Sequence, residues 1–149
     1  MINKRASILV ISGLVLILAA LFIYPKLNKQ ENAYAGDLTC LSSNLPQIQH
    51  FHPKLRISVN GGEEVVPANA GLSGNCHLPL HTHAADNVIH VESQVVKDYT
   101  LGQFLEVWGK SIQREGYDLT MSVDGKPSNE LENLVFRDNQ EIVLSYKSK

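Results

Sequence analysis

The sequence predicts an α+β fold in which one main helix packs on a mixed sheet of about five strands, preceded by an N-terminal transmembrane helix. Three observations lead to this prediction. Apolar and polar residues alternate in several short segments, which is typical of half-buried strands. A single segment combines a capping sequence with apolar residues at helical spacing. The order along the chain is a hairpin, further strands, the helix and then more strands.

The N-terminal segment has the pattern of a sequence that inserts into a membrane. Lys4 and Arg5 precede an apolar run that ends at residue 24, and a span needs about 17–25 apolar residues. We expect residues 1–24 to be an uncleaved signal anchor, because the polar spacer 25–32 is long for a cleaved peptide. The alternative is cleavage at Ala35. In both cases the basic N-terminus stays in the cytoplasm, and the remainder is extracytoplasmic, periplasmic or extracellular.

The rest of the chain is expected to be a tether, residues 25–37, and one extracytoplasmic domain, residues 38–149. Beyond residue 24 the chain has 11 Lys and Arg against 15 Asp and Glu, and the two signs are mixed. The sequence contains no basic patch, so we do not expect nucleic acid as a partner.

Two cysteines, Cys40 and Cys76, are present. In an oxidising compartment two thiols most often form one disulfide, which would stabilise the domain by roughly 3–4 kcal/mol in the loop-entropy model. The alternative is that Cys76 is a metal ligand beside His77.

The first predicted strands form a hairpin that follows an irregular segment, residues 38–53. Apolar and polar residues alternate over 55–59, and Asn60-Gly61 is a strong signal for a two-residue turn. Val65-Val66 is the expected return strand.

The predicted helix opens at Thr100, because Thr100-x-x-Gln103 fits a capping box. Gly116 is the expected stop, and Gly109 inside the helix costs about 1 kcal/mol relative to alanine. One helical stripe carries the apolar residues Leu101, Phe104, Leu105, Trp108 and Ile112.

The last predicted strands are 117–123, which is followed by an Asp124-Gly125 turn, 134–136 and 141–146. The sequences Y-T-L-G-Q-F, V-D-G-K and D-N-Q-E-I-V-L-S-Y in this part of the chain resemble β-grasp domains of the transcobalamin-like type. The resemblance implies a β-grasp-like sheet with one helix, and it implies no chemistry.

All six histidines lie between positions 50 and 90. We expect two short strands there, 77–83 and 88–92, with a turn at 84–87 between them. The first strand must lie at an edge, because Pro79 cannot donate a backbone hydrogen bond.

This hairpin predicts a metal site. His81 and His83 fall on one face of a strand, because side chains alternate with period two. The proposed turn places His90 directly across from His81, with Glu92 one step further along the same face. Three imidazoles and a carboxylate would then surround a common point. Glu92 is expected as a ligand or as a group that orients a ligand ring.

His50 and His52 form a second H-x-H pair, which would complete the first site or make a weaker second one. His77 has no such pattern and is expected to be an ordinary surface residue.

The motifs H-F-H-P, L-H-T-H, I-H-V-E and T-L-G-Q-F-L-E-V-W-G, which begin at positions 50, 80, 89 and 100, resemble a family of uncharacterised membrane-anchored bacterial and archaeal proteins. Members often have an aspartate after L-H-T-H, where this chain has Ala84. The resemblance supports a histidine site and a membrane anchor, and it implies no activity.

Imidazole suits zinc, copper, iron and nickel, and the chain has only two methionines, which argues against a Cu(I) site of the thioether type. We expect a Cu(II) or Zn(II) site for metal capture, delivery or sensing. Its expected partners are the ion, the membrane and a membrane protein. Three alternatives stay open: a zinc hydrolase or lyase with Glu92 as general base, an iron site of two histidines and a carboxylate, and a metal-free interaction domain that senses pH.

Overall fold

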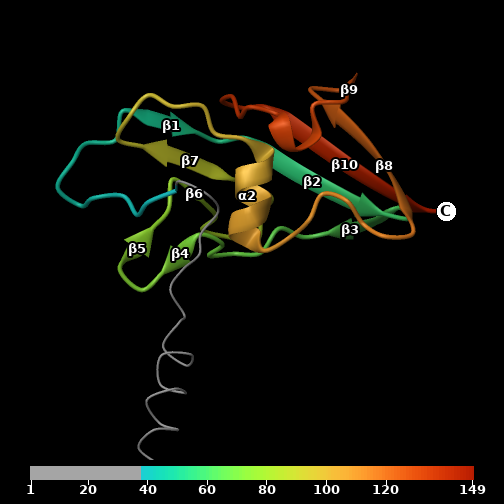
Figure 1. The fold of residues 1–149 in the computed structure, drawn as a ribbon, viewed down its shortest axis with the longest axis horizontal. Coiled ribbons are helices and arrows are strands. Elements are labelled where there is room, and N and C mark those ends of the chain that lie inside the picture. Colours follow the sequence, from blue (N-terminus) through green and yellow to red (C-terminus); the bar gives the residue numbers. More distant parts are fainter. Residues whose placement is uncertain (1–37) are drawn as a thin grey trace, which may run out of the picture. The chain divides into compact units, whose positions relative to one another are not determined.

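The computed structural model describes residues 38–149. The predicted signal anchor and tether therefore lie outside the described residues. The domain is mostly β-sheet with one α-helix (Figure 1), which confirms the predicted α+β class. No helix within residues 38–149 has the length and apolar character needed to cross a membrane. The elements, in chain order, are β1 (Gln49–Phe51), β2 (Lys54–Val59), β3 (Gly62–Glu64), β4 (Leu72–Ser73), β5 (Cys76–His77), β6 (Leu80–His81), β7 (His90–Ser93), α2 (Leu101–Trp108), β8 (Tyr117–Val123), β9 (Lys126–Ser128), η1 (Leu131–Asn133) and β10 (Glu141–Ser148).

The larger sheet has five strands in the order β3-β2-β10-β8-β9. It is mixed, because β10 runs parallel to β2 and antiparallel to β8. Buried and exposed residues alternate along β2 and β10, as the sequence pattern predicts. Their buried side chains, from Leu55, Ile57, Ile142 and Leu144, belong to one hydrophobic core with the apolar face of α2.

The predicted hairpin exists, with its return strand in a different place. Asn60 and Gly61 both have positive φ, at 52° and 86°, as a two-residue hairpin turn requires. Since Val59 then pairs with Gly62, the return strand begins directly after the turn as β3. The prediction of Val65-Val66 as that strand is wrong.

The capping box of the helix is confirmed. Thr100 accepts a hydrogen bond from the backbone N–H of Gln103, whose side chain accepts one from the N–H of Thr100. The helix ends much earlier than predicted, because Gly109 is its C-cap, with a left-handed φ of 73°, and does not lie in its interior. Ile112 is buried, although it lies beyond the helix.

We expect Thr100→Ala to destabilise the domain by about 1 kcal/mol, because it leaves the backbone N–H of Gln103 without its acceptor at the helix start. The only tryptophan, Trp108, lies at the other end of α2, so its fluorescence reports unfolding in urea. Thr100→Ser keeps the hydroxyl and should retain most of the stability. Equal stability of the alanine and serine variants would contradict this role of the cap.

A three-stranded sheet, called the smaller sheet below, carries His50, His81 and His90 and has the order β1-β7-β6, and β4 and β5 form a separate two-stranded sheet. Here the predicted strand 77–83 is wrong in its length. It divides at Pro79 into β5 and β6, because β5 pairs with β4 whereas β6 pairs with β7. After β6 the chain leaves the β6–β7 pair. The N–H of Thr82 donates to the carbonyl of Ala70, and the hydroxyl of Thr82 donates to the carbonyl of Pro67. The turn predicted at 84–87 is therefore part of a longer irregular connection.

Two further predictions are corrected. The segment 38–53, expected to be irregular, contains β1, which pairs antiparallel with β7. The segment 134–136, expected to be a strand, makes only an isolated bridge between Val135 and Thr100.

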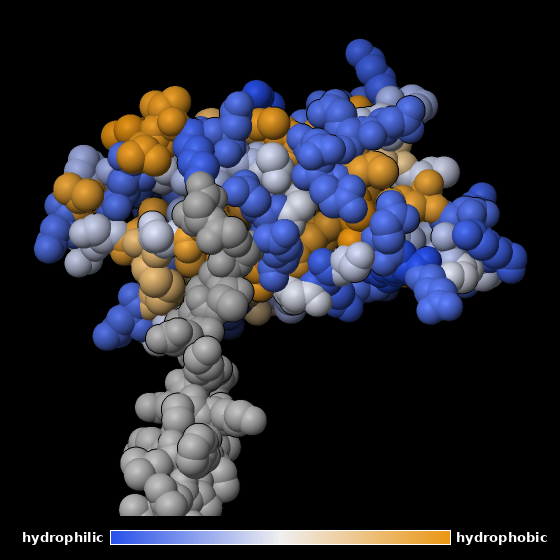
Figure 2. Space-filling model, in the orientation of Figure 1, coloured by the Kyte–Doolittle hydropathy of each residue, from blue (hydrophilic) through white to orange (hydrophobic). Residues whose placement is uncertain are grey.

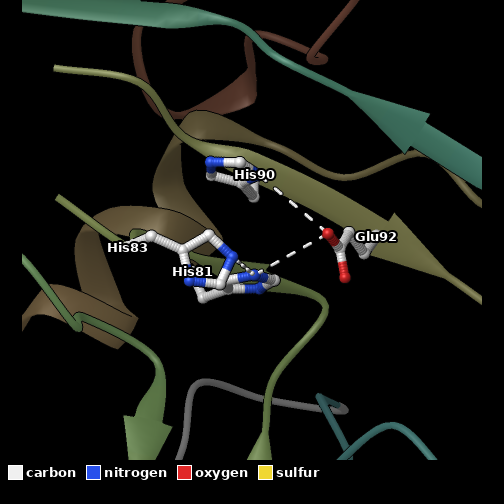
Figure 3. Close-up of side chains that lie close together, drawn as sticks. All are labelled: His81, His83, His90 and Glu92. Atoms are coloured by element: carbon white, nitrogen blue, oxygen red, sulfur yellow. Dashed lines mark hydrogen bonds and ion pairs between the residues drawn. The ribbon is translucent and has the colours of Figure 1, made fainter. Parts of the chain in front are cut away.

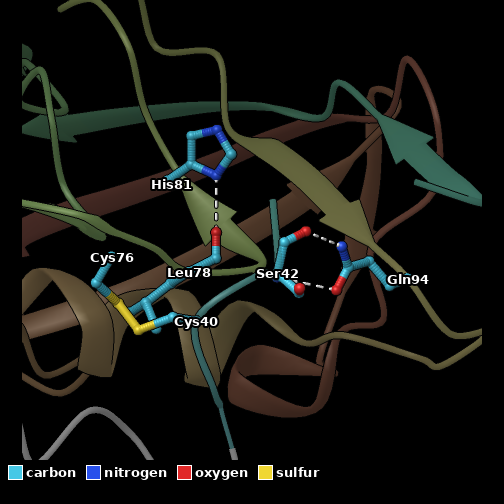
Figure 4. Close-up of a disulfide and its surroundings, with 6 residues drawn as sticks. All are labelled: Cys40, Ser42, Cys76, Leu78, His81 and Gln94. Carbon is cyan, nitrogen blue, oxygen red and sulfur yellow. Dashed lines mark hydrogen bonds between the residues drawn. A yellow bond between two sulfur atoms is a disulfide. The ribbon is translucent and has the colours of Figure 1, made fainter. Parts of the chain in front are cut away.

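A disulfide joins Cys40 to Cys76, as the sequence predicts, and links the segment before β1 to the β4–β5 hairpin (Figure 4).

Hydrophilic residues cover much of the face shown in Figure 2, with apolar patches between them. Val95 and Val96, in the loop after β7, are exposed.

Candidate metal centre

Each of the three neighbouring strands of the smaller sheet brings two side chains to a common cluster. His90 and Glu92 share one face of β7 because side chains alternate along a strand, whereas His52 and His83 lie just beyond the ends of β1 and β6. The antiparallel register sets His81 opposite His90 and His50 opposite Glu92. Since β7 is the middle strand, its pair lies between the other two pairs. The pairs are His50 and His52 at β1, His90 and Glu92 on β7, and His81 and His83 at β6.

Four of these side chains converge closely enough to hold one metal ion. One ligand atom from each of His81, His83, His90 and Glu92 lies within 4.8 Å of the other three. Figure 3 shows the three rings and the carboxylate around a common space. The Nε2 atoms of His81 and His83 are 3.2 Å apart. The Glu92 Oε1 is 4.0 Å from His81 Nε2 and 4.0 Å from His90 Nδ1.

His81 is held in the tautomer that directs the lone pair of its Nε2 toward the other histidines. Its side chain is fully buried, and its Nδ1–H donates to the carbonyl of Leu78 at 2.9 Å (Figure 4). Because a carbonyl only accepts, this bond places the proton on Nδ1 and leaves the lone pair on Nε2. Burial lowers the pKa of His81 to about 4, although the Leu78 carbonyl and the Glu92 charge raise it. The ring is therefore neutral at pH 7, as metal binding requires.

The Nδ1 atom of His90 gives the most direct indication of a metal-ligating role. Within residues 38–149, its Nδ1 is the one buried side-chain nitrogen or oxygen without a hydrogen-bond partner. Leaving such an atom without a partner costs about 1–3 kcal/mol, and native proteins rarely do so. Burial, followed by the neighbouring rings of His83 and His52, lowers the pKa of His90. A neutral, unpartnered imidazole nitrogen among other donors fits a metal ion.

Glu92 is held at the centre by a residue from outside the sheet. Its Oε2 accepts a hydrogen bond from Gln47 Nε2 at 2.5 Å, whereas its Oε1 faces the histidines. This arrangement orients one oxygen toward the space between the rings. A fixed carboxylate of this kind can bind the ion or orient a ligand ring.

The distances agree with metal coordination. Two nitrogens bound to zinc at 2.0–2.1 Å in a tetrahedron are separated by about 3.3–3.4 Å, and the His81–His83 nitrogens are 3.2 Å apart. In a tetragonal Cu(II) site, neighbouring ligand atoms are about 2.9 Å apart and opposite ones about 4.1 Å. The 3.2 Å separation of the His81 and His83 nitrogens lies close to the tetrahedral value, whereas the 4.0 Å separations of Glu92 Oε1 from His81 and His90 are longer, so Glu92 would have to move slightly inward to bind the same ion. The geometry therefore fits a metal ion and leaves its identity open.

A second group of ligand atoms shares His90 with the first. His50, His52 and His90 also offer atoms that lie within 4.8 Å of one another. The ring centroids of His52 and His90 are 4.8 Å apart, and those of His50 and His52 are 4.5 Å apart.

The remaining candidates lie outside both groups. Cys76 forms the disulfide with Cys40 and therefore has no thiolate that could bind a metal, so the alternative of Cys76 as a ligand is wrong. His77 is exposed, with its ring 5.9 Å from that of His81. Sequence reasoning missed Gln47 and the Leu78 carbonyl. Neither has a pattern that could have indicated its role, because both contacts depend on the tertiary fold.

Comparisons with known proteins do not add to this picture. No family model, curated protein or solved structure matches the chain. The site must therefore be interpreted from its own geometry.

Proposed function

We propose that the protein binds one divalent transition-metal ion, Cu(II) or Zn(II), with His81, His83, His90 and Glu92. The observation that carries the proposal is the convergence of four ligand atoms within 4.8 Å around a buried histidine nitrogen without a hydrogen-bond partner. A bound metal ion would give that nitrogen a partner, and its positive charge would offset the charge of the Glu92 carboxylate.

The site favours metal capture, delivery or sensing over catalysis. Catalytic zinc sites usually keep one position for water, whereas sites that only hold the ion are closed by four protein ligands. Here Glu92 would supply a fourth protein ligand, and its side chain is only 12% exposed. A general base would instead need to face a bound water and a substrate.

The proposed setting is outside the cytoplasm. Residues 1–24 would anchor the chain, as their basic and apolar pattern indicates, and a membrane protein would give or receive the ion. The Cys40–Cys76 disulfide supports an oxidising compartment. We also propose that the five-stranded sheet is β-grasp-like. Its central strands, β2 and β10, are parallel, and α2 lies in the chain between the β2–β3 hairpin and the β8–β9 hairpin.

Metal titration of the full-length chain in detergent, after treatment with a chelator, tests the proposal. We expect one equivalent of Zn(II) or Cu(II) to bind tightly. His83→Ala should weaken binding by more than the roughly 10–100-fold that loss of an outer partner costs, because it removes a ligand. Both His83 and the control His77 are exposed, so neither substitution should unfold the domain. His77→Ala should bind like the wild type.

Two results would contradict the proposed function. One is a folded wild-type chain, as judged by Trp108 fluorescence, that binds neither ion. The other is an equal loss of affinity in the His83 and His77 variants, which would indicate nonspecific binding to surface imidazoles.

A further inference from the structure

His90 belongs to both groups of ligand atoms, one with His81, His83 and Glu92 and the other with His50 and His52. The order of the strands explains this. His90 lies on the middle strand, β7, and the two groups extend from it toward opposite neighbours. We refer to the first group as the inner position and to His50, His52 and His90 as the outer position.

The two positions differ in their access to solvent. The side chain of His81 in the inner position is fully buried, that of His90 is 20% exposed, and that of His50 is 50% exposed. Exposure of these three histidines therefore increases from β6 through β7 to β1, although His83, which lies beyond the end of β6, is itself exposed. An acceptor molecule could reach an ion at the outer position, whereas the buried His81 has no face open to it.

Direct contacts join the outer position to the inner one. The Nε2 of His50 lies 3.3 Å from the Glu92 Oε1, which is the oxygen that faces the inner position. The backbone N–H of His52 donates to Asp138 Oδ1, which holds this residue beside the end of β1. The ring of His52 meets that of His90 edge to face.

We propose that His50, His52 and His90 form an outer metal position through which a divalent transition-metal ion enters and leaves the inner position. This inference rests on the proposed function. His90 stays bound while bonds from the ion to His50 and His52 break and bonds to His81 and His83 form. The oxidation state of the ion does not change, and each released nitrogen keeps its lone pair.

Such a path speeds exchange because a new ligand binds before an old one leaves. Without it, the ion must lose inner ligands with only water to replace them. A position that is only visited on the way changes the rates of entry and release by the same factor and leaves the equilibrium constant unchanged. A ligand of the inner ion would instead change the equilibrium constant.

The experiment compares the full-length wild type with the double variant His50→Ala/His52→Ala and the control His77→Ala. Each protein is loaded with one equivalent of Zn(II), and its transfer to a chromophoric chelator is followed by stopped flow. Entry is measured in the reverse direction, and the dissociation constant by competition. We expect entry and release in the double variant to slow by roughly tenfold each, with an unchanged dissociation constant. The control should match the wild type.

Two outcomes would overturn the inference. Unchanged rates would show that the ion reaches the inner position by another route. Faster release together with weaker binding would show that His50 and His52 bind the inner ion directly. Failure of the proposed function is distinguishable, because the wild type would then take up no zinc before any variant is compared.

Discussion

Replacing Gly71 with alanine is expected to destabilise the domain by on the order of 2–5 kcal/mol and to weaken metal binding. Gly71 has a φ of 75°, which costs a residue with a Cβ roughly 1–2 kcal/mol. A Cβ there would also overlap the carbonyl oxygen of Leu80 and would lie 3.1 Å from the Cβ of His81. Overpacking against backbone typically adds about 1–3 kcal/mol.

The effect on metal binding follows from where the overlap occurs. Leu80 and His81 are the two residues of β6, so a shift that relieves the overlap moves the strand that carries the inner ligand. The Val107 side chain of α2 is also 3.1 Å away and restricts movement in that direction. Glycine at this position therefore lets the chain before β4 lie directly against β6, the strand that carries His81.

Gly74→Ala is the matched control. Gly74 lies in the same hairpin and has a positive φ of 54°, but a Cβ there would meet nothing within 4 Å. It should cost only the roughly 1–2 kcal/mol of backbone strain and leave metal affinity unchanged. Urea unfolding followed by Trp108 fluorescence gives both stabilities. Equal losses in the two variants would show that the contact with β6 is unimportant.

The metal site shows what sequence alone could predict. The His81–His90 pairing followed from period-two alternation and a short connection, and the structure has this pair. The predicted turn was nevertheless wrong, because Thr82 binds the Ala70 and Pro67 carbonyls. The pairing survives because β7 and β6 are fixed by other contacts, such as the hydrogen bond from the N–H of Glu92 to the Pro79 carbonyl.

The outer position could not be predicted as part of the same site. His50 and Glu92 are far apart in the sequence, and only the pairing of β1 with β7 brings them opposite one another. A three-residue strand after a proline-containing segment carries little local signal. The order of strands in a sheet depends on tertiary packing, which alternation along one strand does not encode.

The two ends of the helix differ in how well the sequence predicts them. Its start was predictable, because Thr100 and Gln103 form a local capping box. Its end was not, because Gly109 could be read as a tolerated interior residue or as a left-handed cap. The apolar stripe extended to Ile112, which lies in the loop after the helix and packs in the hydrophobic core from there. Periodicity alone cannot separate those two ways of burying a side chain.

The metal-free protein is expected to lose on the order of 3 kcal/mol of stability as the pH falls from about 6.5 to about 4, because of His81. Its pKa is about 4 in the folded domain and about 6.5 in the unfolded chain. Between these values the unfolded chain binds the proton and the folded domain does not. The stabilisation is therefore fully present above pH 6.5 and is lost progressively toward pH 4. His90, whose pKa is also lowered, acts in the same direction.

Urea unfolding at a series of pH values, with a chelator present, measures this slope. His81→Asn removes the titrating group and keeps a donor for the Leu78 carbonyl, so its stability should change much less over the same range. His77→Asn, at an exposed histidine, should keep the wild-type slope. The same slope in the wild type and in His81→Asn would show that the His81 ring is not held neutral by burial. The lone pair assigned to its Nε2 would then be protonated at mildly acidic pH, and metal binding would weaken at a higher pH than a pKa of about 4 allows.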